Sequence, residues 1–175
     1  MTFFRDIAEA FMLIESEPNG RQNVLNYLKM AYVGGSKLFF IGNGGSAAIA
    51  SHMAADWMKN GGFQAMCFND ASSLTCLGND LGYENVFAFP VNRFSRIGDV
   101  LFAISSSGQS RSITKAAEAA TDQRLNVVTL TGFDPHNSLR KLGGINFYVP
   151  SMNYGVVEVV HLAILHSLLN EVMAS

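Results

Sequence analysis

Five short apolar runs alternate with helical patterns along most of this chain, and this alternation restricts the fold more than any other feature. The runs cover residues 37–41, 64–68, 99–104, 126–131 and 145–149, and each is followed by Gly, Ser, Asn or Asp residues and a helical pattern. Continuous apolar runs between helices are typical of parallel strands that are covered on both faces. The sequence therefore predicts a doubly wound α/β fold, with a parallel five-stranded sheet sandwiched by helices.

Two further helices are expected before the first strand, because apolar residues recur at helical spacing in 3–14 and 21–33. The last helical pattern, 155–173, is apolar almost all round, which is typical of a helix covered on several sides. Since about half of the chain is apolar, we expect another subunit to supply that cover. The 175 residues are expected to form one domain, 1–175, with helices used in oligomerisation at 1–35 and the α/β core at 36–175.

Charge and cysteine content exclude several classes of partner. The formal net charge is −2, which gives no electrostatic basis for binding nucleic acid. The apolar stretches fall short of the roughly 20 residues of a membrane span, and the N-terminus lacks a signal-peptide pattern. Cys67 and Cys76 have no metal-like spacing and are expected to be free thiols in a reducing compartment. We therefore expect a cytoplasmic protein without membrane association.

A glycine-rich loop, GNGGS at 42–46, follows the first predicted strand and leads into a helix. Gly44 and Gly45 let the backbone approach an anion, the helix start favours negative charge, and Ser46 can donate its hydroxyl. An ordinary tight turn is one alternative. A dinucleotide site is another, because Asp70 lies about where an acid that binds the ribose would be expected.

A second loop, SSSGQS at 105–110, favours a different ligand. It places four serines after a neighbouring predicted strand, again before a helix. Serine hydroxyls and helix-start N–H groups together can bind a phosphate, although one serine alone could simply cap the helix. Four serines facing a second anion-binding loop predict one small phosphorylated ligand and no nucleotide cofactor.

These motifs resemble those of the sugar isomerase (SIS) domain, which has a flavodoxin-like fold. The resemblance rests on GNGGSA at 42–47, GND at 78–80, ISSSGQS at 104–110 and TLTG at 129–132. His52, GND and HLAILH at 161–166 are similar to the phosphoheptose isomerases, which convert sedoheptulose 7-phosphate to D-glycero-D-manno-heptose 7-phosphate. The resemblance implies an aldose–ketose isomerase that acts through an enediol(ate). The alternative is a non-catalytic SIS domain that senses a sugar phosphate or bridges partner proteins.

The resemblance also implies the site residues. Asp56 and His166 would be the acid/base residues, and the positions of His52, Asp56, Glu158 and His166 can bind zinc, one ion per subunit. Together with Ser46, the expected contacts to the sugar phosphate are Asn43, Gly44, Gly45, Asn79, Asp80, Ser105, Ser106, Ser107, Ser110 and Glu158. Active sites of the family lie between the subunits of a homotetramer, so a tetramer with shared sites is expected here.

Spacing limits which of these residues can act together. An isomerase needs one base for a carbon-bound proton and one acid/base group for the oxygens, and a carboxylate and a histidine suit both tasks. His52 and Asp56, four residues apart, share one helix face. Glu158 and His166 would be about 12 Å apart on a straight helix. Either the helix begins after Glu158, or the two residues belong to sites shared between subunits. His161 points about 140° away from His166 and is expected to be a buried or interface residue.

Three features depart from the isomerase pattern. Asp56 is one methylene shorter than the family's Glu, and Glu158 carries a charge where the family has Gln. The segment 57–64 is shorter than in the family and lacks its arginine, for which Lys59 is the candidate replacement. These changes surround the sugar and not the phosphate. They predict an altered substrate or reaction at a phosphosugar site.

Overall fold

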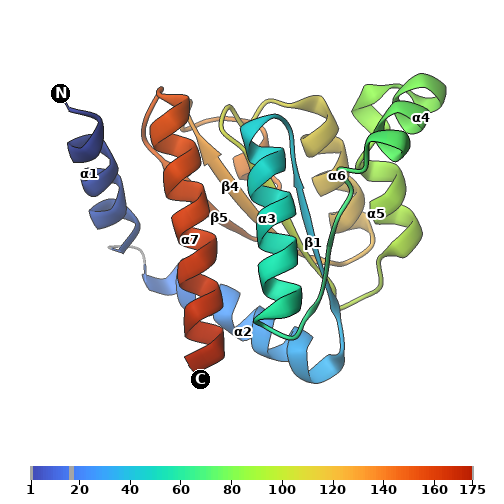
Figure 1. Cartoon of the computed structure of the whole chain (residues 1–175), viewed down its shortest axis with the longest axis horizontal. Helices are drawn as coiled ribbons and strands as arrows, with labels where there is room; N and C mark the ends of the chain where they lie inside the picture. The colour runs from blue at the N-terminus through green and yellow to red at the C-terminus, as the bar shows by residue number, and fades with distance from the viewer. Residues whose placement is uncertain (1, 16–17, 175) are drawn as a thin grey trace.

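The computed structural model describes residues 2–15 and 18–174 and confirms the predicted α/β architecture (Figure 1). Helices α1 (Phe3–Glu15) and α2 (Pro18–Gly34) precede the sheet. The strands are β1 (Lys37–Gly42), β2 (Gln64–Cys67), β3 (Val100–Ser105), β4 (Asn126–Gly132) and β5 (Ile145–Val149). The other helices are α3 (Gly45–Lys59), α4 (Ala71–Leu81), α5 (Ala88–Phe94), α6 (Arg111–Asp122) and α7 (Tyr154–Ala174), with short 3₁₀ turns η1 (Tyr83–Asn85) and η2 (Leu139–Lys141).

The five strands form one sheet in the order β2-β1-β3-β4-β5, and every pair is parallel. Each strand lies within one residue of its predicted bounds. The chain runs outward from β1 to β2 on one side and from β3 to β5 on the other. The order therefore reverses between β1 and β3, and ligands of open α/β sheets bind beside such a reversal, at the carboxyl ends of the strands.

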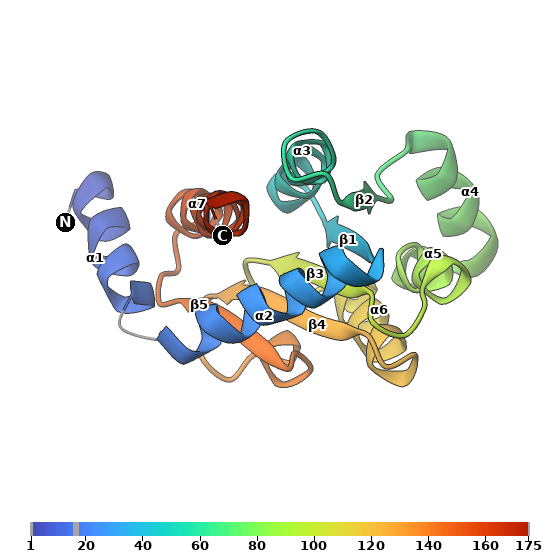
Figure 2. The ribbon, with the colours of Figure 1, turned by 90° about the horizontal axis from the view of Figure 1, so that it is seen from below.

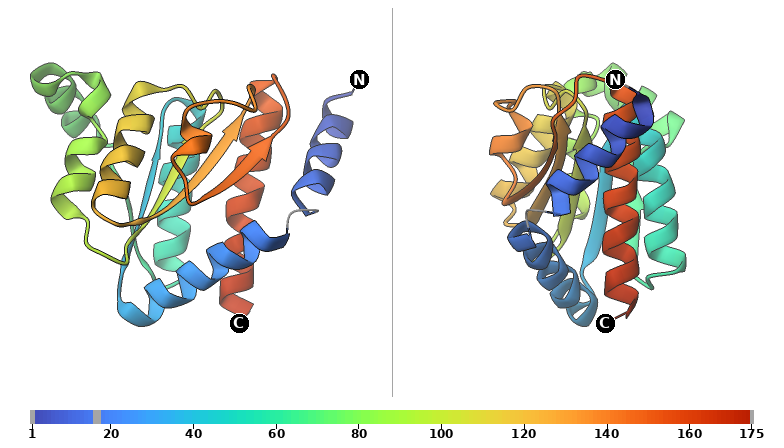
Figure 3. Two further views of the ribbon diagram at one scale, coloured as in Figure 1. Left: turned by 180° about the vertical axis from the view of Figure 1, so that it is seen from behind. Right: turned by 90° about the vertical axis from the view of Figure 1, so that its left-hand side faces the viewer.

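Two layers of helices cover the sheet, with α3 and α7 on one face and α5 and α6 on the other (Figure 2). Alternate side chains of the strands enter the two cores, since Phe40 and Phe102 pack with α3 and α7, whereas Phe39 and Leu101 pack with α5 and α6. The continuous apolar runs are thus explained by burial on both faces. Helix α2 crosses below the amino ends of the strands, at the opposite end of the sheet from the carboxyl ends (Figure 3).

Helix α7 differs from the expectation that the apolar stretches of the chain fall short of the length of a membrane span. Within the described ranges it is the one helix that is long and apolar enough to span a membrane by length and composition. In the fold, however, it packs against α3 and the sheet, and Val157, Val160, Leu165 and Leu168 are buried in the core. The apolar character of α7 therefore has an explanation in the core of the domain.

Candidate functional site

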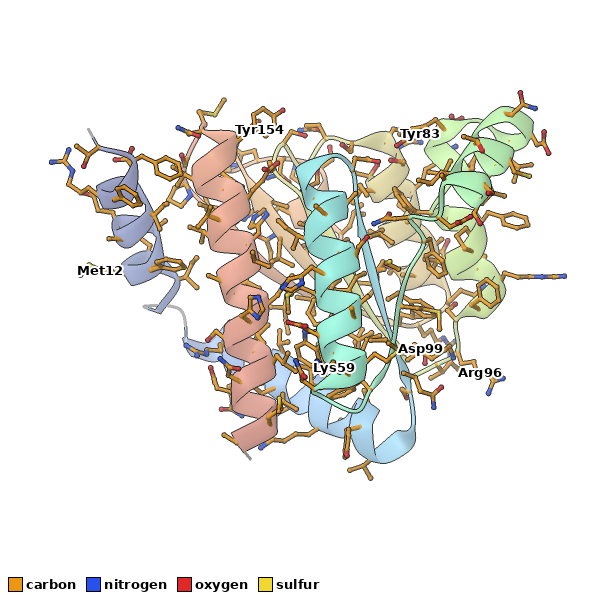
Figure 4. All side chains as sticks on the ribbon, in the orientation of Figure 1. Met12, Lys59, Tyr83, Arg96, Asp99 and Tyr154 are labelled. Atoms are coloured by element: carbon orange, nitrogen blue, oxygen red, sulfur yellow. The ribbon has the colours of Figure 1, made fainter. Side chains whose placement is uncertain are left out.

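The glycine-rich and serine-rich loops lie side by side because they follow neighbouring strands, β1 and β3. Between them is a cavity of about 230 Å³. It is lined by both loops and by the first two turns of α7, through Asn43, Gly44, Gly45, Ser46, Ile104, Ser105, Ser106, Ser107, Ser110, Tyr154 and Glu158. Figure 4 labels Tyr154 and Tyr83 at this carboxyl end of the sheet. The structure thus brings nine of the predicted substrate residues to one cavity.

The glycine loop needs its glycines for two separate reasons. Gly44 has φ 55°, a left-handed conformation that glycine adopts without strain. Gly45 is the first residue of α3, and a Cβ there would overlap the Glu158 carboxylate. Glycine at position 45 therefore allows α7 to place a carboxylate directly against the start of α3.

The serine loop presents hydroxyls that the protein itself leaves unpaired. The Ser106 hydroxyl is buried, at 5% exposure, and has no hydrogen-bond partner among the described residues. Ser110 is the N-cap residue of α6, but its side chain makes no capping hydrogen bond. Leaving a buried polar group unpaired costs free energy, so these hydroxyls are suited to bind an anionic ligand at the start of α6.

Asn43 links the glycine loop to two other segments. Its Oδ1 accepts a hydrogen bond of 2.8 Å from the Tyr83 hydroxyl, and its Nδ2 donates to Ser112 Oγ at 2.9 Å. Sequence reasoning missed Tyr83, although it lies only three residues after the GND motif. The three-way contact fixes the side chain of Asn43 at the edge of the cavity.

Six sequence-predicted residues lie away from the cavity: Asn79, Asp80, Lys59, His52, Asp56 and His166. Asn79 and Asp80 are exposed at the end of α4, where Asn79 Nδ2 donates to Asp80 Oδ1 at 2.8 Å, and neither residue lines the cavity. Lys59 is the last residue of α3, at the opposite end from the glycine loop (Figure 4). Within one chain, the structure does not bring these residues to the sugar-phosphate cavity.

Asp70, which left the dinucleotide alternative open, has a local role. Its carboxylate is the N-cap of α4 and accepts hydrogen bonds from the Ser73 N–H at 2.9 Å and the Ser73 hydroxyl at 3.1 Å. These hydrogen bonds lower the pKa of Asp70. The position of this acid is explained by helix capping, without a ribose.

His52, Asp56 and His166 form a cluster between α3 and α7. The two Nε2 atoms of the histidines are 3.3 Å apart, and Asp56 Oδ2 lies 3.6 Å from His52 Nε2 and 3.9 Å from His166 Nδ1. One ligand atom from each residue lies within 4.8 Å of the others, so the group could hold a metal ion. Two imidazoles and a carboxylate are a common zinc donor set. Ligand atoms about 2.0 Å from a tetrahedral zinc are separated by about 3.3 Å, which agrees with the distance between the histidines.

Glu158 lies outside this cluster. Because α7 begins at Tyr154, Glu158 is inside the helix, and His166 follows two turns or about 12 Å later. The idea that the helix begins after Glu158 is therefore wrong. One chain brings together three of the four predicted metal ligands and places Glu158 in the cavity of the two loops. That Glu158 and His166 belong to sites shared between subunits stays a prediction.

His161 is fully buried and joins α7 to the sheet. Its Nε2 lies 3.2 Å from the carbonyl oxygen of Thr131, near the carboxyl end of β4. Burial lowers the pKa of His161 to about 4, because the charged imidazole would lose its hydration. His161 is therefore neutral, and its Nε2–H donates to Thr131. This agrees with the expectation that His161 is a buried residue.

Comparison with known proteins shows which family this chain is similar to. Residues 2–132 match the family model of the SIS domain. The phosphoheptose isomerase of Colwellia psychrerythraea is 38% identical over 144 residues, covering 78% of this chain and 74% of that protein. That of an Enterobacter species is 34% identical over 165 residues, covering 91% and 85%. The structure of the phosphoheptose isomerase from Neisseria gonorrhoeae is similar with a TM-score of 0.87 and 29% identity, over 98% of this chain and 95% of that one.

Proposed function

Since this chain belongs to the SIS domain family, and within it to the phosphoheptose isomerases, we propose that it isomerises sedoheptulose 7-phosphate or a related heptose phosphate. The observation that carries this proposal is the cavity between the two loops, with the unpaired, buried Ser106 hydroxyl in its wall. A phosphorylated sugar supplies the acceptor oxygens that this hydroxyl lacks.

The phosphate is held by the serine loop. Ser106 and Ser110 donate their hydroxyls, and the N–H groups at the start of α6 add a favourable electrostatic field. No lysine or arginine lines this cavity. Binding therefore depends on hydrogen bonds and the helix start, with Asn43 and the glycine loop contacting the sugar.

We assign the proton transfers to Asp56 and His166 of a site shared between subunits, because within one chain neither residue lines the cavity of the two loops. One of them removes the proton from the carbon next to the carbonyl and returns it to the neighbouring carbon, and the other moves the proton between the two oxygens through the enediol(ate). Asp56 Oδ2 and His166 Nδ1 lie 3.9 Å apart, so the two groups are neighbours although no direct hydrogen bond joins them. The shorter side chain of Asp56, compared with the family's Glu, requires the sugar to approach α3 more closely.

Zinc is proposed for the cluster of His52, Asp56 and His166, one ion per subunit, since the donor set and the spacing fit it. A bound zinc ion would polarise the carbonyl oxygen of the sugar. The exposed position of His52 leaves the cluster open on one side, which is consistent with a homotetramer whose sites are shared between subunits. We expect this assembly to be cytoplasmic.

The test is direct conversion of sedoheptulose 7-phosphate, followed by NMR of the aldose product with and without added zinc. The wild type should form the aldose, and Asp56→Asn should lose at least about 100-fold in rate, as expected for a misplaced or missing base. Asp122→Asn, at the exposed end of α6, is the matched control and should keep full activity. Binding of sugar phosphates without any conversion would instead support the non-catalytic sensor.

A further inference from the structure

Among the described residues, Glu158 supplies the one carboxylate in the lining of the cavity, and no lysine, arginine or histidine accompanies it there. The other lining residues are Gly, Ser, Asn, Ile and Tyr. No hydrogen bond or ion pair joins the Glu158 carboxylate to another of the described residues. A cavity suited to bind a phosphate therefore also contains an uncompensated negative charge.

The position of this carboxylate indicates which of the two loops binds the phosphate. The carboxylate lies against Gly45 at the start of α3, where a helix N-terminus favours an anion, but it makes no hydrogen bond to the described N–H groups there. The glycine loop thus faces a carboxylate that the protein supplies. The free hydroxyls of Ser106 and Ser110 are on the serine loop, at the start of α6, so that loop is left for the phosphate.

A ligand whose phosphate lies at the serine loop meets this negative charge beside the glycine loop. A carboxylate accepts hydrogen bonds from sugar hydroxyls and attracts an ammonium group, but it repels another carboxylate. An uncharged amide in place of this carboxylate would not make this distinction. Placing a like charge against the wrong ligand is a common way to obtain specificity.

From this arrangement we propose that Glu158 determines charge specificity. The site accepts phosphosugars whose opposite end is a neutral polyol, favours those with a protonated amino group there, and excludes phosphorylated sugar acids. The inference rests on the proposed function, because it requires a phosphosugar in the cavity. It goes further by stating which chemical class of phosphosugar the pocket rejects.

The experiment uses three ligands that share a six-carbon chain and a terminal phosphate: glucosamine 6-phosphate, glucose 6-phosphate and 6-phosphogluconate. Isothermal titration calorimetry gives their dissociation constants for the wild type, for Glu158→Gln and for the distant control Glu9→Gln. We expect the wild type and the control to bind the amino sugar at least about tenfold more tightly than the acid. In Glu158→Gln this ratio should fall to about threefold or less, mainly through tighter binding of 6-phosphogluconate.

An unchanged ratio in Glu158→Gln would contradict the inference and leave the isomerase proposal intact. If none of the three ligands binds the wild type, the phosphosugar cavity itself is refuted, and the inference falls with it. Should Glu158→Gln fail to fold, as judged by circular dichroism, Glu158→Ala removes the same charge and leaves space in its place. The same loss of discrimination is expected, and its absence would again contradict the proposal.

Discussion

Acidification should destabilise this protein through His161, a residue outside the proposed chemistry. The imidazole is fully buried and neutral, and its Nε2–H donates to the carbonyl oxygen of Thr131. Its pKa is lowered to about 4 in the folded chain, from an ordinary value of 6.5. Between these two values the unfolded chain binds a proton that the folded chain does not, so stability falls as the pH decreases from 6.5 towards 4.

The size of the effect follows from the two pKa values. For a folded pKa of about 4, the loss is about 2 kcal/mol at pH 5 and about 3 kcal/mol at pH 4. Above the unfolded pKa of 6.5 none of this stability is lost. Replacing His161 by Leu removes the pH-dependent loss and also the hydrogen bond to Thr131, and the loss of that hydrogen bond costs about 1 kcal/mol at neutral pH.

Urea unfolding at fixed protein concentration, followed by circular dichroism from pH 7 to pH 4, measures both chains. The wild type should be the more stable at pH 7, and His161→Leu should become the more stable near pH 5 and below. All other residues are the same in both proteins, so their contributions cancel in the difference. A difference in unfolding free energy that stays constant with pH would refute a buried, neutral His161.

Three further predictions concern the site. Ser106→Ala should weaken phosphosugar binding about tenfold in calorimetry with little change in melting temperature, because its hydroxyl has no protein partner among the described residues. An unchanged affinity would contradict its role. Gly45→Ala should lower the melting temperature by several degrees, since the new methyl overlaps the Glu158 carboxylate, and the double variant with Glu158→Ala should recover most of that loss. Asp56→Ala should reduce zinc affinity at least about tenfold in competition titrations, and an unchanged zinc affinity in this variant would contradict the cluster.

The sheet could be predicted because its sequence signal is local. Each strand is buried on both faces and is therefore a continuous apolar run that ends at Gly, Ser, Asn or Asp. Between β2 and β3 the sequence predicts one helical pattern where the structure has two helices, α4 and α5, and α4 has no buried side chain to create a periodic pattern. The available signal was Asp70 followed by Ser73, a helix N-cap, which instead suggested a ribose contact.

The site could be predicted only in part. His52 and Asp56 share a helix face through their spacing alone, but the approach of His166 depends on how α3 packs against α7. Spacing also separated Glu158 from His166, and the start of α7 at Tyr154 excludes one of the two explanations offered for it, a helix that begins after Glu158. The contact from Tyr83 to Asn43 joins distant segments, and no local pattern indicates it.

The central claim is proton transfer between adjacent carbons of a phosphosugar by Asp56 and His166. It is tested most directly by incubating the protein with sedoheptulose 7-phosphate in deuterated water and measuring deuterium at C2 of the aldose by NMR. We predict incorporation by the wild type and by Asp122→Asn, and none by His166→Ala or Asp56→Ala. Wild-type protein that binds the sugar phosphate but incorporates no deuterium, with or without zinc, or variants that incorporate it at the wild-type rate, would contradict the account.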